Sequence, residues 1–251
     1  MARETTICAG RSAASPNVAA LVGKASYVQI DVATGCGSDL GWASSARGLD
    51  LRLTEPDQAS ELYRYAWLIG RLPVRASIPS TPGVASAVRI AIALGIAVQL
   101  AFPPQVAYAW SELDDVLDFY LHGRFVGQPV EPFHSLLQAA FYRRRENVWR
   151  VQDEDPACIR FVSGQGRPMV PSRFECQADV RPDKRFVARW RAAAASPGWA
   201  CCDCTFQRDC GGYFLWPDPA TQCDAIPLWN RIVQAAEQLL DDLQPEGASP
   251  A

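Results

Sequence analysis

Five of the chain's nine cysteines lie within 25 residues, in the stretch WACCDCTFQRDCGGYFLWPDPATQC. Four of these thiols have the spacing Cys201-x2-Cys204-x5-Cys210-x12-Cys223, and Cys202 is an extra. Two cysteines separated by two residues can bind one metal ion or one edge of a cluster, because a tight turn points both thiolates to the same side. We therefore expect the four spaced thiols to share one metal site.

The spacing leaves the identity of the metal open. A structural zinc site usually has two C-x2-C turns, whereas this stretch has one. The thiols of a bacterial ferredoxin come every third residue, which is closer than here. An iron–sulfur cluster held by an irregular loop fits the spacing better, and zinc or thiols without a metal remain the alternatives. Cys158 and Cys176 could hold part of a second metal site or could be buried thiols in a hairpin.

The remaining composition indicates a globular protein that buries a core. Of 251 residues, 49% are apolar and 20% are charged, and the net charge of -3 predicts neither nucleic acid nor an anionic membrane as a partner. The longest apolar run, residues 90–102, is too short to span a bilayer. An odd number of cysteines without a secretory signal argues against a disulfide framework. We therefore expect a cytoplasmic protein with reduced thiols.

Strands and helices alternate before the cysteine-rich stretch. Runs rich in β-branched residues predict strands at 26–33, 49–53, 73–78 and 96–102. Thr54 can cap a helix after the second of these strands, and Gly95 can end a helix before the last. Strand–helix–strand units at this spacing predict parallel strands joined by right-handed crossovers. We therefore predict an α/β fold, with a partial (β/α) barrel-like domain over residues 26–155.

The sequence pattern changes after residue 155. Residues 158–176 predict a β-hairpin that turns on Gly164 and Gly166. A short helix is predicted near 183–195, before the cysteines. Together these features predict a small cysteine-rich metal-binding domain over residues 156–243.

Both chain ends are predicted to be disordered, over residues 1–25 and 244–251, because they are small and polar in composition. The last helix is predicted over residues 226–243. Its apolar residues recur at helical spacing and should share one buried face, formed by Leu228, Ile232, Ala236, Leu239 and Leu243.

The segment CCDCTFQRDCGGYF resembles the C-x2-C-x5-C segment with following glycines of SPASM domains, the C-terminal extensions of many radical SAM peptide-modifying enzymes. The hairpin that ends at Cys176 and the α/β layout before it are similar to those enzymes as well. The resemblance implies a 4Fe–4S cluster with Cys201, Cys204 and Cys210 as ligands and Cys223 as the closing ligand. It also implies a peptide substrate or a radical SAM partner enzyme.

Two features depart from that family. Members with two auxiliary clusters have a further cysteine directly after the glycines, where this chain has Phe214. The C-x3-C-x2-C motif that defines the radical enzymes is absent, and the loop after the predicted first strand offers Cys36 alone. We therefore expect no SAM binding, and predict an accessory or partner subunit in the modification of a peptide or small molecule.

Two alternatives belong to other classes of protein. A zinc ion bound by the same thiols could serve only to stabilise a structural or interaction protein. Glu131 and His134 could instead form a pair for proton transfer, although a role at a helix end explains such residues more simply.

Overall fold

The strands that the structure describes form one mostly parallel sheet. The computed structural model describes residues 5–10, 27–32, 46–104, 106–163, 167–175, 182–218, 220 and 222–242. The strand order is β6-β5-β4-β3-β2-β1-β7-β8, and neighbouring strands are parallel except for β7 with β8. The strands are β1 (Thr5–Gly10), β2 (Tyr27–Asp31), β3 (Leu49–Arg52), β4 (Val74–Pro79), β5 (Ala97–Ala101), β6 (Val130–Glu131), β7 (Ile159–Ser163) and β8 (Pro168–Met169). The predicted α/β class is confirmed.

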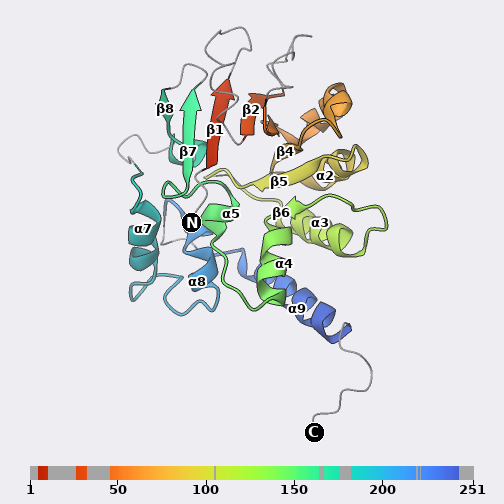
Figure 1. Ribbon diagram of the computed structural model, residues 1–251. Helices are drawn as coiled ribbons and strands as arrows, with labels where there is room; N and C mark the ends of the chain where they lie inside the picture. The colour runs from red at the N-terminus through yellow and green to blue at the C-terminus, as the bar shows by residue number, and fades with distance from the viewer. Residues whose placement is uncertain are drawn as a thin grey trace.

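Helices connect the successive strands from β3 to β6. The connecting helices are η2 (Pro56–Leu68), α2 (Val84–Ala93) and α3 (Trp110–His122). The predicted helix after Thr54 is thus a 3₁₀ helix, which begins beside a side-chain hydrogen bond between Thr54 and Gln58. Helix α2 packs against η2, β4 and β5, and α3 packs on α2, so these helices cover one face of the sheet (Figure 1).

The remaining helices follow β6 and extend to the C-terminal part of the chain. They are α4 (Phe133–Phe141), α5 (Val148–Val151), α6 (Ser172–Glu175), α7 (Phe186–Ala194), α8 (Gln207–Cys210), η3 (Tyr213–Leu215) and α9 (Ile226–Asp242). Helix α9 packs against α4 and α3, and it buries Leu228, Ile232 and Ala236 as predicted. The prediction is wrong for Leu239, which is 42% exposed, and Leu243 lies outside the described residues.

The two faces of the sheet differ in chemistry because successive side chains of a strand point to opposite faces. The face toward η2 and α2 is apolar, with Leu51 and Ile78 fully buried. On the other face, β3 presents Asp50, β4 presents Arg75 and Ser77, and β5 presents Gln99, where their side chains bond to one another and to the segment after α5. Strands buried in a parallel sheet are usually apolar on both faces. The polar face is therefore a candidate for function.

The N-terminal part of the sheet differs from the prediction. Residues 1–25 were expected to be disordered, but Thr5–Gly10 forms β1, which pairs in parallel with β2 and β7. The rest of that segment, and the predicted disordered tail 244–251, lie outside the described residues. The strand expected to be first, at 26–33, is therefore the second, and the loop with Cys36 follows β2. Since the C-x3-C-x2-C motif is absent from the whole sequence, its absence does not depend on this correction.

The predicted hairpin is present as β7 and β8, which pair antiparallel with Phe161 opposite Met169. Its turn residues, Gly164 and Gly166, lie outside the described residues. Because β7 also pairs with β1, the hairpin extends the main sheet beyond residue 155. Within the described residues, no helix is both long and apolar enough to cross a membrane.

Candidate metal centre

The cysteine-rich stretch folds as a series of tight turns between α7 and α9, which we call the cysteine loop (residues 196–226). The backbone N–H of Cys204 donates to the carbonyl of Cys201, and that of Gln207 donates to the carbonyl of Cys204. The first turn brings the chain back after two residues, as expected for a C-x2-C pair. Helix α8 follows directly and ends at Cys210, which is buried, as is Cys201.

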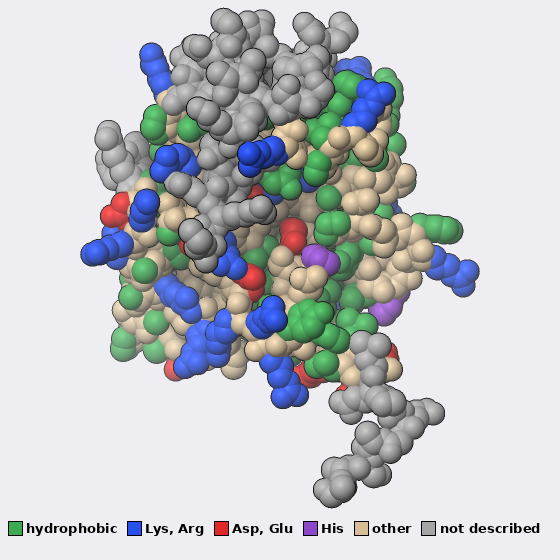
Figure 2. Space-filling view, viewed as in Figure 1, with side chains coloured by type: hydrophobic (Ala, Val, Ile, Leu, Met, Phe, Trp, Pro, Cys, Tyr) green, Lys and Arg blue, Asp and Glu red, His purple; other side chains and the backbone are tan. Residues whose placement is uncertain are grey.

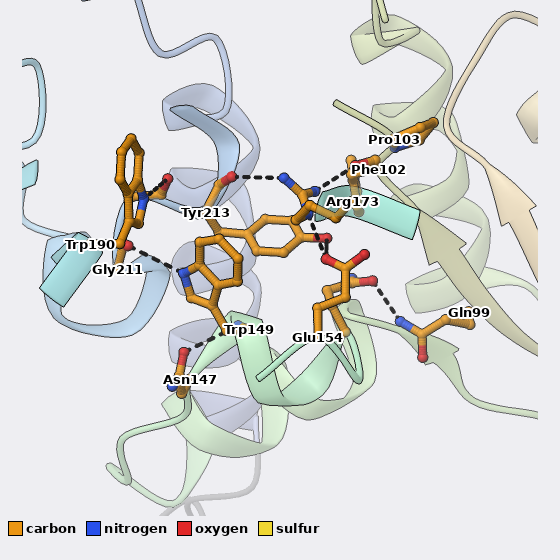
Figure 3. A network of polar contacts seen from close by, with 12 residues as sticks. Gln99, Phe102, Pro103, Asn147, Trp149, Glu154, Arg173, Trp190, Gly211 and Tyr213 are labelled. Carbon is orange, nitrogen blue, oxygen red and sulfur yellow. Dashed lines mark hydrogen bonds and ion pairs between the residues drawn. The ribbon is translucent and has the colours of Figure 1, made fainter. Parts of the chain in front are cut away.

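Two glycines turn the chain sharply after Cys210. Gly211 and Gly212 have φ angles of +59° and +71°, a region that favours glycine. A Cβ atom on Gly212 would lie 2.9 Å from Nε1 of Trp190. Both glycine carbonyls are held, since the indole of Trp149 donates to Gly211 and that of Trp190 donates to Gly212, at 3.2 and 3.0 Å (Figure 3). The turn is therefore fixed by packing as well as by its own conformation.

This turn directs backbone N–H groups at sulfur. Burial raises the pKa of the Cys210 thiol to about 12, while hydrogen bonds from the backbone of Phe214 and Tyr213 act to lower it. Cys223 has the same kind of surroundings: burial raises its pKa, and the backbone of Ala225 and Ile226 lowers it. N–H groups directed at sulfur stabilise a thiolate, which is the form that binds metals. Two of the four predicted ligands therefore lie in sites built for a thiolate.

The four thiols lie close enough to affect one another electrostatically. Burial raises the pKa of Cys201 to about 11, and Cys223 and Cys204 raise it further. Cys210 is affected by Cys223 and Cys201, and Cys223 by Cys204. Cys201 and Cys223 also pack in one small apolar cluster with Leu215. The fold therefore gathers the four predicted thiols in one region, and none of them is in a disulfide.

The separation of the thiols bears on the kind of metal. No three His, Cys, Asp or Glu side chains within the described ranges are arranged so that they could hold one metal ion. A zinc ion, with Zn–S bonds of about 2.3 Å, would bring its four sulfurs to within about 4 Å of one another. A cluster of several irons has its ligands on different iron atoms and so tolerates a wider spread. The chemistry of the four donors fits either metal, and their spread is closer to what a cluster requires.

Aromatic side chains surround this region. Trp190, Trp216 and Trp229 are buried, and the rings of Trp190 and Trp216 meet edge to face, with centroids 4.7 Å apart. Trp199 lies against Trp190 at 6.1 Å. Such a shell excludes water from a metal centre and so affects its redox potential.

A buried arginine connects the cysteine loop to the sheet, and the sequence gave no sign of it. The side chain of Arg173, on α6, is fully buried and pairs with Glu154. It also donates to the carbonyls of Tyr213 in η3 and Phe102 after β5 (Figure 3). The hydroxyl of Tyr213 donates to the same Glu154 carboxylate at 2.7 Å. One guanidinium thus joins the sheet, the segment after α5 and the turn that follows Cys210.

The outer surface beside the cysteine loop is basic. Exposed arginines follow one another along α7 and α8, namely Arg185, Arg189 and Arg208. Figure 2 shows Lys and Arg side chains gathered on the side of the molecule where Figure 1 places these helices. Arg145 lies against this surface and pairs with Asp209 at 3.6 Å. A positive surface of this kind attracts acidic partners.

The other predicted site residues lie apart from this centre. Cys158 precedes β7, where burial and Asp155 raise its pKa, and Cys176 lies outside the described residues. Glu131 accepts hydrogen bonds from the backbone and hydroxyl of Ser135, at the start of α4.

His134 bonds through its two ring nitrogens to Tyr120 and Gln138, at 2.7 and 3.0 Å. Glu131 and His134 therefore have the helix-end and packing roles that were the simpler interpretation of both residues.

Comparison of the chain with protein-family models, with curated proteins and with solved structures found no match. The assignment of a function therefore depends on the geometry described above.

Proposed function

We propose that the chain is an iron–sulfur protein whose cluster is bound by Cys201, Cys204, Cys210 and Cys223. The observation that carries the proposal is the set of backbone N–H groups directed at Cys210 and Cys223. A buried thiol without a metal has no need of two N–H donors, whereas a thiolate in a low-dielectric site does. A 4Fe–4S cluster is the proposed cofactor, and it would supply one-electron chemistry.

The sheet supports the rest of the proposal. Strands β1 to β6 are neighbours in chain order and parallel, the order that a partial (β/α) barrel requires. The hairpin and the cysteine loop follow it, in the order proposed for a SPASM-like extension. Because the chain lacks the C-x3-C-x2-C motif, we propose an accessory or partner role beside a radical SAM enzyme that modifies a peptide or small molecule.

The structure gives this partner a place to bind. The basic surface of α7 and α8 adjoins the segment from Cys204 to Cys210, because Arg191 donates to the carbonyl of Arg208 and Arg145 pairs with Asp209. An acidic surface on the partner enzyme would thus lie next to the proposed cluster.

Single cysteine variants, reconstituted anaerobically with iron and sulfide, test the cluster. Cys210→Ser should remove most of the broad absorbance near about 400 nm that arises from thiolate-to-iron charge transfer. Cys202→Ser is the matched control, because Cys202 is exposed and has an adjacent position in the chain, and it should keep the full absorbance. Equal absorbance in the two variants, or none in the unmodified protein, would contradict the proposal.

A further inference from the structure

A cavity of about 200 Å³ lies on the polar face of the sheet, at the carboxyl ends of β3, β4 and β5. The carboxyl edge of a parallel sheet is where ligands bind in most α/β proteins. The cavity is lined by Asp50, Arg75, Gln99 and Gln152 among its polar residues and by Phe102 and Met169 among its apolar ones. It holds none of the four clustered cysteines, so its role is separate from that of the cysteine loop.

The polar groups of the cavity are held in place by one another. Asp50 is fully buried and accepts hydrogen bonds from Gln29, Ser77 and Arg75, at 2.9, 2.7 and 3.2 Å. Arg75 uses its other terminal nitrogen to pair with Asp153, and so bridges two carboxylates. Such a network is pre-organised, since each charged group already has a partner that fixes its position.

Two donors in this network lack a partner. Nε of Arg75 and Nε2 of Gln152 are enclosed and make no hydrogen bond, although Gln152 is only 7% exposed. A buried donor left unpaired costs about 1–3 kcal/mol. A ligand that brings an acceptor atom to them recovers part of this cost, and one without an acceptor does not.

The charges select among ligand classes. An anion would approach Asp50 and Asp153, which already share the guanidinium of Arg75. A cation would leave both unpaired donors unsatisfied and would meet Arg52, which also lines the cavity. An amide has a carbonyl for the donors and an N–H for the carboxylates, and it carries no charge. The volume equals that of about seven water molecules at about 30 Å³ each, which limits the ligand to roughly ten non-hydrogen atoms.

We propose that this cavity binds a small uncharged amide, of the size of one amino-acid residue with its two flanking peptide groups. The carbonyl of the amide would accept from Gln152 and Arg75, and its apolar part would lie against Phe102 and Met169. The site is independent of any metal in the cysteine loop, so its test does not depend on the iron content of the protein.

Titration calorimetry with N-acetylalaninamide tests the site, and N-acetylalanine is the matched anion, because the two probes differ only in a carboxamide against a carboxylate. We expect the amide to bind saturably and at least tenfold more tightly than the anion. Gln152→Leu removes a proposed donor and should weaken binding of the amide at least fivefold. Gln238→Leu, at an exposed position of α9, is the control and should change nothing.

Met169→Trp is a second variant, at a position that is 39% exposed and so tolerates a larger side chain. It fills the mouth of the cavity and should abolish binding, even if Gln152→Leu were to fold poorly. The proposal is overturned if the amide does not bind, if the anion binds as tightly, or if neither Gln152→Leu nor Met169→Trp weakens binding.

Discussion

The parallel sheet and the cysteine loop are stabilised in different ways. In the sheet, fully buried apolar residues such as Leu51 and Ile78 pack between the strands and the helices η2 and α2. The cysteine loop is mostly turns, and its order depends on directional contacts: two indoles that donate to glycine carbonyls, and backbone N–H groups directed at sulfur. A hydrophobic core tolerates small changes in shape, whereas directional contacts fail when one atom moves. The two regions should therefore respond differently to the same kind of perturbation.

The largest effect is expected where the two regions meet. Arg173→Met removes the guanidinium that pairs with Glu154 and binds the carbonyls of Tyr213 and Phe102. It leaves Glu154 without its cationic partner in a largely buried place, and breaking a buried pair costs about 3–5 kcal/mol. Urea denaturation should show this loss in the free energy of unfolding.

Arg189→Met is the control for this change, since Arg189 pairs with Asp183 at the surface. Exposed pairs contribute about 1 kcal/mol or less, so the control should change little. Equal losses in the two variants would mean that Arg173 does not connect the regions.

A change inside the sheet should lower stability without affecting the metal centre. Leu51→Ala creates a cavity at a fully buried position of β3, and such changes cost about 3 kcal/mol. We expect this loss in urea denaturation together with an unchanged iron content of the folded protein. A loss of iron in proportion to the loss of stability would show that the two regions are not separable.

A change at the glycine turn should have the opposite pattern. Gly212→Ala places a Cβ atom 2.9 Å from Nε1 of Trp190 at a φ angle of +71°, and we expect a loss of about 2 kcal/mol together with reduced iron content. Gly198→Ala is the matched control, because Gly198 also has a positive φ angle but no atom within 4 Å of the added Cβ. It should lose about 1 kcal/mol and keep its iron. If Gly212→Ala keeps its iron as well, the turn does not position Cys210.

Metal removal should affect only the cysteine loop. We expect the backbone amides of Tyr213 and Phe214 to exchange with deuterium about tenfold faster after chelation, because their acceptor at Cys210 is no longer a metal-bound thiolate. Amides of β4 should exchange at an unchanged rate. Faster exchange across both regions would show that the metal stabilises the whole fold.

Much of the sheet could be predicted from the sequence because its signals are local. The strands at 49–53, 73–78 and 96–102 and the hairpin at 158–176 are present, since β-branched runs separated by helix caps and glycines determine such elements over short distances. Strand β1 was missed because TTICAG is a short run in a polar context and gains its partners only from β2 and β7. Pairing of this kind depends on tertiary structure.

The polar face of the sheet had a signal that was not used. Asp50 and Arg52, and likewise Arg75 and Ser77, alternate with apolar residues in strands that are otherwise buried. In a parallel sheet this alternation indicates a face with a function. The role of Arg173 could not have been predicted, because its partners come from segments 19, 40 and 71 residues away in the chain.

For the metal centre, the spacing of the cysteines predicted which thiols lie near one another, while the N–H groups around Cys210 and Cys223 emerge only in three dimensions. The conformation of two glycines and the packing of two tryptophans direct the first of these sets, and no local spacing encodes that packing.

Iron, acid-labile sulfide and zinc, measured per chain after anaerobic purification without added metal, test the central claim most directly. A 4Fe–4S cluster on the four thiols of the cysteine loop requires about four irons and four sulfides per chain, with little zinc. One zinc per chain without sulfide, or no metal at all, would contradict the account.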